Sequence, residues 1–177
     1  MVKLHDLEFE PYLEHHTLQE SIKQLAKQIS EDYKGKTPLF LGILNGAFMF
    51  LSDLMKYYEG DCEISFTKLA SYEGTSSTGS VNTLLGAGNL KGKDMIVVED
   101  IVDTGHTLEH IVAVLKKEGV ASFKIASLFL KPEAYTKTLP VDYVGFEIPN
   151  KFIVGFGLDY NGLGRNISEI YQLKSNN

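Results

Sequence analysis

The chain has 177 residues, of which 44% are hydrophobic and 23% are charged, and its formal net charge is −6. This composition excludes collagen-like, low-complexity and disordered chains, and a chain of this length buries roughly 70% of its unfolded surface. The acidic balance argues against a general attraction to nucleic acid or to anionic membranes. The single cysteine, Cys62, excludes a disulfide framework and a cysteine-based zinc site, and it suits a reducing cytosol.

Neither a membrane span nor a signal peptide is expected. The longest apolar stretch, Leu39–Leu51, is interrupted by glycine and asparagine and is too short to cross a bilayer. Asp6, Glu8 and Glu10 lie where a signal peptide needs apolar residues. No linker, like-charge block or internal repeat divides the chain. We therefore expect a cytoplasmic protein with one domain over residues 1–177.

The first helix is expected close to the N-terminus. Thr17 and Glu20 have the spacing of a capping box, which predicts a helix start at this point. The apolar residues that follow recur at helical spacing: Leu18, Ile22, Leu25 and Ile29. Gly35 is the expected stop signal.

Strand-like and helical segments then alternate to the end of the chain. Strands are expected at residues 38–44, 63–71, 94–98, 123–130 and 143–146, and helices at 47–58 and 106–118, the latter capped by Gly119. In the second strand Ile64 and Phe66 alternate with Ser65 and Thr67. Strands separated by helices imply right-handed crossovers, so the predicted fold class is α/β with an open, doubly wound, mostly parallel sheet. Ligands of such sheets bind at the carboxyl ends of the strands.

The most informative segment runs from Val97 to Leu108. A buried strand is expected to end in the adjacent carboxylates Glu99 and Asp100, and a third carboxylate, Asp103, follows. The next four residues, Thr104, Gly105, His106 and Thr107, place backbone N–H groups and hydroxyls at a helix N-terminus, where an anion such as phosphate is favoured. Carboxylates repel phosphate, so Glu99 and Asp100 would bind sugar hydroxyls or Mg²⁺. The segment therefore suggests a site for a sugar phosphate with a metal.

Each part of this segment has a simpler interpretation. Thr107 could be an ordinary N-cap, and Glu99 and Asp100 could be solvated residues that close a strand. The segment is not a Walker A loop, because it does not end in Gly-Lys-Ser/Thr. Residues 73–80 contain no apolar residue, which indicates either a functional lid or a disordered surface insertion.

The 97–108 segment resembles the signature with which type I phosphoribosyltransferases bind 5-phosphoribosyl pyrophosphate (PRPP). Further segments resemble the hypoxanthine-guanine phosphoribosyltransferases in order and spacing: 44–47, 70–72, 130–132, 144–155, 158–161 and Arg165. The resemblance extends from about Leu39 to Arg165. It implies a core over residues about 36–165 and a small hood formed by the N-terminal segment and residues 145–177. It also implies a mobile active-site loop that begins at Ser71 and Tyr72.

The resemblance implies a pentosyltransferase of purine salvage. The reaction would join PRPP to hypoxanthine or guanine, giving IMP or GMP and pyrophosphate, with Mg²⁺ as cofactor and in a homodimer or homotetramer. Its transition state resembles an oxocarbenium ion, which requires that water be excluded. The relative preference among hypoxanthine, guanine and xanthine does not follow from the residues.

The resemblance also assigns roles to individual residues. Asp103 would be the general base at purine N7, and Thr104, Gly105, His106 and Thr107 would hold the 5′-phosphate. Glu99 and Asp100 would bind the ribose and Mg²⁺, with Asp159 supporting the metal through water. Asn45, Gly46 and Arg165 would bind pyrophosphate. The purine would be bound by Lys131 at O6, by the ring of Phe152, by the backbone of Ile153 and by Asp159.

Two of these positions depart from the family pattern. Many relatives have lysine at the position of His106, and relatives often have a basic residue at the position of Asn45. At both places the backbone N–H groups would remain as the binding groups, and the family often has a cis peptide in the 44–45 loop. Lys131 has a simpler interpretation as a lysine reaching solvent from the sheet end, and Phe152 as a core residue.

Two other functions are open to the sequence. A Mg²⁺-dependent receiver domain also combines acidic strand ends with a strand-terminal Lys-Pro, but it needs an acidic pair after its first strand, where this chain has Leu44-Asn45-Gly46. A non-catalytic relative could sense PRPP or nucleotides and regulate RNA or DNA. The presence of Asp103 and the acidic charge favour catalysis over sensing.

Overall fold

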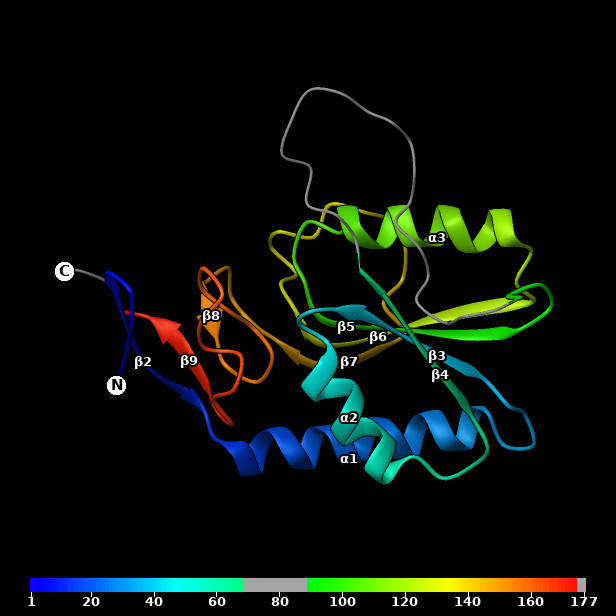
Figure 1. The fold of residues 1–177 in the computed structure, drawn as a ribbon, viewed down its shortest axis with the longest axis horizontal. Helices are drawn as coiled ribbons and strands as arrows, with labels where there is room; N and C mark the ends of the chain where they lie inside the picture. Colours follow the sequence, from blue (N-terminus) through cyan, green and yellow to red (C-terminus); the bar gives the residue numbers. More distant parts are fainter. Residues whose placement is uncertain (69–88, 175–177) are drawn as a thin grey trace, which may run out of the picture.

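Two β-sheets organise the chain, and the computed structural model describes residues 1–68 and 89–174 (Figure 1). The larger sheet contains, in spatial order, β4 (Glu63–Lys68), β3 (Leu39–Leu44), β5 (Asp94–Val102), β6 (Ser122–Leu130) and β7 (Tyr143–Glu147). All its neighbouring strands are parallel. The smaller, antiparallel sheet contains β1 (Val2–Leu4), β2 (Leu7–Leu13), β9 (Ile170–Leu173) and β8 (Ile153–Val154).

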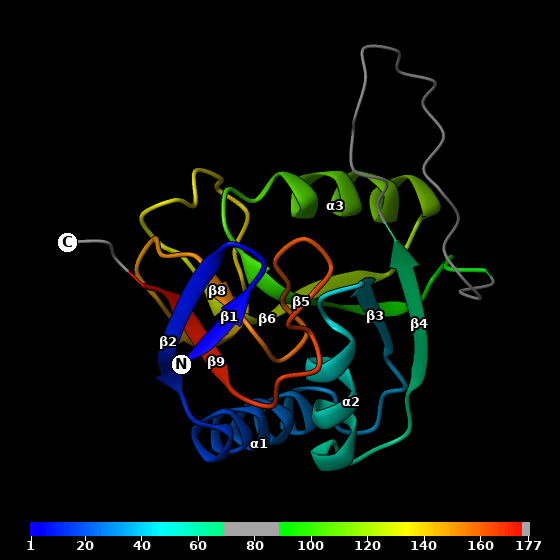
Figure 2. The ribbon, with the colours of Figure 1, turned by 60° about the vertical axis from the view of Figure 1, so that its left-hand side comes forward.

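Helices cover both faces of the parallel sheet (Figures 1 and 2). The helices are α1 (His15–Asp32), α2 (Phe48–Tyr57) and α3 (His106–Glu118). On one face Phe40 and Val98 pack with α1 and α2, and on the other Leu41 and Val97 pack with α3. Alternate residues of β3 and β5 thus enter different cores, as the period of a strand requires. The predicted α/β, doubly wound fold class is confirmed.

The helix α1 starts earlier than its sequence signal indicates. It begins at His15, with Glu14 as N-cap, and no side chain caps its free N–H groups. The predicted capping box at Thr17 and Glu20 is therefore wrong, because Thr17 already lies inside the first turn. The start is fixed by tertiary structure instead, since β2 ends at Leu13 in register with Ile170 and leads directly into the helix.

The edge strand β4 presents two polar residues to the core. Ser65 and Thr67 are buried, whereas Ile64 is 49% exposed. Ser65 and Thr67 lie beside Leu41 and Ile43 of β3, on the face that α3 covers. The predicted end of this strand, residues 69–71, lies outside the described residues.

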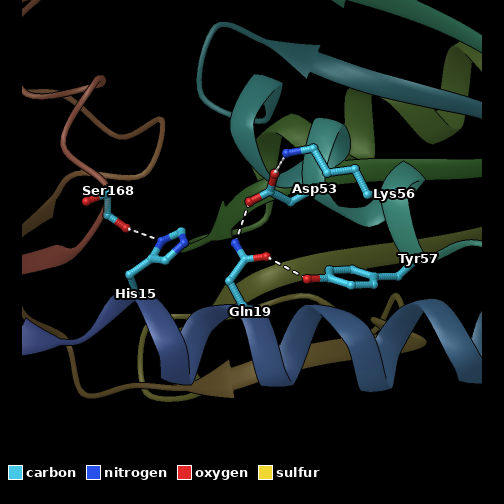
Figure 3. A network of polar contacts seen from close by, with 6 residues as sticks. All are labelled: His15, Gln19, Asp53, Lys56, Tyr57 and Ser168. Atoms are coloured by element: carbon cyan, nitrogen blue, oxygen red, sulfur yellow. Dashed lines mark hydrogen bonds and ion pairs between the residues drawn. The ribbon is translucent and has the colours of Figure 1, made fainter.

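Polar contacts join α1 to α2 and to the C-terminal segment (Figure 3). Asp53 of α2 is buried, and its carboxylate accepts hydrogen bonds from the Gln19 amide and the Lys56 ammonium. On the next turn of α1 toward the N-terminus, the His15 ring lies 3.1 Å from the Ser168 carbonyl oxygen. The hydrogen bond between Gln19 and Asp53 thus joins α2, whose first residues follow the 44–46 loop, to α1.

The small sheet brings the two ends of the chain together (Figure 2). Strand β2 pairs with β9, and side chains from the small sheet form a separate small core that includes Leu4, Phe9 and Val154. Among the described residues, no helix is both long enough and apolar enough to cross a membrane.

Candidate active site

The acidic pair Glu99–Asp100 lies within β5 rather than after it. Sequence periodicity ends this strand at Val98, but the strand continues to Val102, so that part of the prediction is wrong. The reason is pairing: β5 stays in register with β6 up to Val102, whereas its pairing with β3 stops at Val98. Both carboxylates are only 8% exposed, which rejects the interpretation that they are solvated residues closing a strand.

Burial makes this pair costly to ionise. It raises the pKa of Glu99 well above its ordinary value, and the neighbouring charge of Asp100 raises it further. Burial also raises the pKa of Asp100, against the opposing effect of hydrogen bonds and of the Arg165 charge. Within the described part of the chain, Glu99 Oε2 has no hydrogen-bond partner. A buried acidic pair with an unpartnered oxygen fits a divalent cation, which Mg²⁺ sites typically bind through one or two carboxylates plus substrate oxygens.

The loop after β5 forms the N-terminus of α3. Gly105 is the N-cap, with a left-handed φ of 85°, and no side chain caps the helix. Thr107 is therefore not the N-cap. A pocket lies over this loop and is lined by residue 99 and residues 101–108. The predicted phosphate residues Thr104, Gly105, His106 and Thr107 thus share one pocket with Asp103, at the positive end of a helix dipole.

Asp103 and Lys131 meet at the carboxyl ends of adjacent strands. The Lys131 ammonium lies 2.9 Å from Asp103 Oδ2, and the backbone N–H of Lys131 donates to the Val102 carbonyl. The lysine side chain is 8% exposed and the aspartate 45%. In the free protein Asp103 is therefore the partner of the buried Lys131 ammonium, and the predicted contact of Lys131 with purine O6 stays a prediction. The alternative of a lysine reaching solvent fails, because the side chain is buried.

The 44–46 loop contacts the acidic pair from the other side. The Leu44–Asn45 peptide bond is cis. Gly46 lies directly against the Asp100 carboxylate, so that any Cβ at this position would overlap Asp100 Oδ2. The carbonyl of Gly46 likewise lies against Gly157, where φ is +99° and a Cβ would overlap it. Close backbone approach therefore requires glycine at both positions.

Arg165 lies next to this loop. Its guanidinium donates to the Gly157 carbonyl at 2.7 Å and forms an ion pair with Asp159 at 2.6 Å. The second Asp159 oxygen accepts the N–H of Gly162. The described residues contain no group of three or more acidic, histidine or cysteine side chains that could hold a metal. Asp159 itself is ion-paired with Arg165. The predicted indirect role of Asp159 at the metal stays a prediction.

Two of the predicted purine-binding residues, Phe152 and Ile153, lie at the small sheet. Phe152 is 42% exposed, which is unlike a core residue, whereas Ile153 is buried in β8. The Phe152 ring meets the edge of Tyr160 and tilts against Phe9. Ser71 and Tyr72, the predicted start of the loop, lie outside the described residues.

One charged group near the phosphate loop was missed by the sequence analysis. The Lys137 ammonium pairs at 2.6 Å with Glu109, in the first turn of α3, and its stem packs on Gly105. A Cβ at residue 105 would lie 2.7 Å from Lys137 Cγ. Lys137 lies in a segment between strands without periodicity, so no local pattern could have placed it beside the loop.

Comparison with known proteins agrees with this geometry. The family model described as a phosphoribosyl transferase domain matches residues 9–161. A hypoxanthine-guanine phosphoribosyltransferase of Streptococcus pyogenes is 44% identical over 154 residues, 86% of each chain, and one of Streptococcus mutans is 42% identical over the same shares. A crystal structure of a hypoxanthine phosphoribosyltransferase from Staphylococcus aureus is 40% identical, with a TM-score of 0.86 over 96% of this chain and 92% of that one. The chain therefore belongs to the phosphoribosyltransferase family and is an enzyme of its hypoxanthine-guanine group.

Proposed function

We propose that the enzyme transfers the 5-phosphoribosyl group of PRPP to hypoxanthine and guanine, giving IMP or GMP and pyrophosphate. The observation that carries the proposal is the ion pair of Lys131 and Asp103 beside the N-terminus of α3. It presents a hydrogen-bond donor and an acceptor side by side. A 6-oxopurine has the complementary groups on one edge, an acceptor at O6 and a donor at N7–H. Adenine has an amino group at C6 and would face the ammonium with a second donor.

Asp103 is the general base in this proposal. When the base binds, Lys131 donates to O6, and the carboxylate of Asp103 accepts the proton of N7 as the new glycosidic bond forms. The 45% exposure of the Asp103 side chain leaves it accessible to a ligand, whereas the buried Lys131 cannot turn away to solvent. The two side chains therefore orient the purine as well as share its proton.

The loop of Thr104, Gly105, His106 and Thr107 holds the 5′-phosphate through backbone N–H groups and hydroxyls. The exposed His106 ring is not required for this role, because the left-handed Gly105 already starts the helix with its amides unpaired by side chains. Glu109 would repel phosphate, and its pairing with Lys137 removes this obstacle.

Mg²⁺ is the proposed cofactor, held by Glu99 and Asp100, which also bind the ribose hydroxyls. When bound, the metal would neutralise charge on the pyrophosphate oxygens. The buried, unpartnered Glu99 oxygen supports this assignment. Asn45 and Gly46 offer backbone groups to pyrophosphate, and Arg165 offers paired N–H donors.

In this proposal both sheets contribute residues to the purine site. Phe152 stacks on the ring, the backbone of Ile153 binds its edge, and the small sheet acts as a hood over a single domain of residues 1–177. The enzyme acts in the cytoplasm as a homodimer or homotetramer, without nucleic acid or membrane partners.

Turnover with separate bases tests the proposal. Purified enzyme with PRPP and Mg²⁺ receives hypoxanthine, guanine, xanthine or adenine, and nucleotide and pyrophosphate are both measured. We expect turnover with hypoxanthine and guanine, and adenine to be disfavoured on the order of 10⁴-fold in kcat/KM, as for sites built around specific hydrogen bonds. Binding of PRPP without turnover of any base would instead favour a sensing function.

A further inference from the structure

The turn between β1 and β2 lies far from Tyr160 in sequence, yet it contacts that residue. We infer that Asp6, in this turn, is a positioning residue for purine binding that acts through Tyr160 on Phe152. The inference rests on the proposed function, in which Phe152 stacks on the purine. No sequence pattern assigned chemistry to this N-terminal segment.

Phe152 needs support because its ring is 42% exposed. The Tyr160 ring forms a T-shaped contact with it, with centroids 5.9 Å apart and planes at 82°, and Phe9 tilts against it at 6.1 Å. Such edge contacts orient an aromatic ring and leave part of it open to a ligand. Phe9 is fully buried in the small core and cannot move independently. The adjustable support of Phe152 is therefore Tyr160.

The N-terminal turn holds Tyr160 at its far end. The Tyr160 hydroxyl donates to Asp6 Oδ1 at 2.9 Å, across 154 residues of sequence. The ring of the adjacent His5 meets the Tyr160 ring edge-on at 5.7 Å, and His5 Nε2 lies 3.2 Å from the Asn161 carbonyl oxygen. His5 has a positive φ of 50°, which directs this turn toward residues 160–161.

The backbone around Tyr160 is fixed independently of its hydroxyl. Tyr160 and Leu163 exchange two backbone hydrogen bonds, and the Asp159 carboxylate caps the same turn at Gly162. Removal of the Tyr160–Asp6 bond should therefore release the ring while the Asp159–Arg165 pair stays in place. The expected effect is confined to the purine and leaves PRPP binding unchanged.

The test compares three variants with a matched control. Tyr160→Phe keeps the ring and removes the hydroxyl, Asp6→Ala removes the acceptor, and Asp6→Asn keeps an acceptor oxygen. The control is Tyr171→Phe, which removes an equivalent tyrosine–carboxylate bond, 2.8 Å to Glu169, in the same small sheet. Each protein is measured for the KM of hypoxanthine, the KM of PRPP, kcat and the melting temperature.

We expect Tyr160→Phe and Asp6→Ala to raise the hypoxanthine KM about three- to tenfold, the range for one net hydrogen bond. The PRPP KM should stay within about twofold, as should every constant of the control. For Asp6→Asn, the hypoxanthine KM should lie close to the wild-type value. The double variant Tyr160→Phe/Asp6→Ala should be no worse than either single variant, because both remove the same bond.

Three results would overturn the inference. An unchanged hypoxanthine KM in Tyr160→Phe, with the wild type active, refutes the role of the hydroxyl while the proposed function stands. Equal increases in both KM values with a lower melting temperature indicate a merely structural role. A wild type that binds PRPP but turns over no purine refutes the proposed function and the inference with it.

Discussion

The Lys131 ammonium and the Asp103 carboxylate lie 2.9 Å apart at the carboxyl ends of β6 and β5, and the lysine is the buried member of the pair. A buried ammonium is costly without a counter-charge, so the two groups depend on each other in the free protein. A 6-oxopurine would have to insert its O6–N7 edge at this pair. We therefore expect changes at either residue to affect both the binding of the base and the balance of charge.

Replacement of the proposed base tests the chemical step. We expect Asp103→Asn to lower kcat about 10²- to 10⁴-fold, because the amide cannot accept the N7 proton. The amide oxygen still accepts from Lys131, so PRPP affinity and the fold should be largely retained. Steady-state kinetics, PRPP titration and thermal melting check this, and near-normal turnover would defeat the assigned role.

Replacement of the lysine tests purine selection. Lys131→Met keeps length and apolar bulk but removes the donor to O6. We expect it to raise the hypoxanthine and guanine KM values by about tenfold or more, with the PRPP KM little changed. Lys56→Met is the control, because Lys56 also pairs with an aspartate but is 65% exposed and lies on α2. Unchanged hypoxanthine kinetics would contradict the assignment to O6.

The close approach of Gly46 to Asp100 gives a steric prediction. Gly46→Ala places a Cβ on the Asp100 carboxylate, so the loop or the carboxylate must move. We expect a large loss of activity together with a higher KM for PRPP. Gly35→Ala is the control, because that glycine has a φ of +76° and nothing within 4 Å of a Cβ. It should cost only about 1 kcal/mol of stability and no activity.

The buried Glu99 predicts a pH-dependent stability. Its folded pKa is raised, so its contribution to stability is fully present below its ordinary pKa and is lost as pH rises through the folded value. Without divalent cations, Glu99→Gln should therefore melt higher than the wild type at pH 8, and the difference should shrink toward pH 5. Added Mg²⁺ should raise the melting temperature of the wild type more than that of the variant.

Exposed Glu133 provides the control for this substitution, since Glu133→Gln should follow the wild type at every pH. A Glu99→Gln protein that melts like the wild type from pH 5 to pH 8 would show that the buried carboxylate carries no such penalty.

A cluster at the opposite end of the sheet predicts the reverse pH dependence. Asp32 accepts hydrogen bonds from the Tyr143 hydroxyl at 2.6 Å and from the Lys124 ammonium at 2.9 Å, and both lower its pKa. A lowered pKa stabilises the fold above the ordinary value for aspartate, and this stability is lost as pH falls below it. Asp32→Asn should therefore lower the melting temperature at pH 7, and the difference should shrink as the pH falls below the ordinary pKa of aspartate. The neighbouring Glu31→Gln should lack this pattern.

Local sequence signals located some boundaries and missed others for physical reasons. The bounds of α3 agree with the prediction because Gly105 and Gly119 both adopt left-handed conformations that glycine favours. The predicted end of β5 was wrong because no local sequence rule expects adjacent carboxylates inside a buried strand. The hydrogen bond from Tyr160 to Asp6 depends on the pairing of strands from the two ends of the chain. Sequence periodicity does not encode that pairing.

The register of β5 separates two tasks within one site. The positions of Glu99 and Asp100 are set by the pairing of β5 with β6, whereas the amides proposed to bind the phosphate belong to the loop that follows. On its other side β5 pairs with β3 only as far as Val98. Strand β3 stays paired with β4 as far as Leu44. If the proposed roles hold, substitutions in the loop can retune recognition of the phosphate while the positions of the proposed metal-binding carboxylates stay fixed, so the two properties can diversify separately.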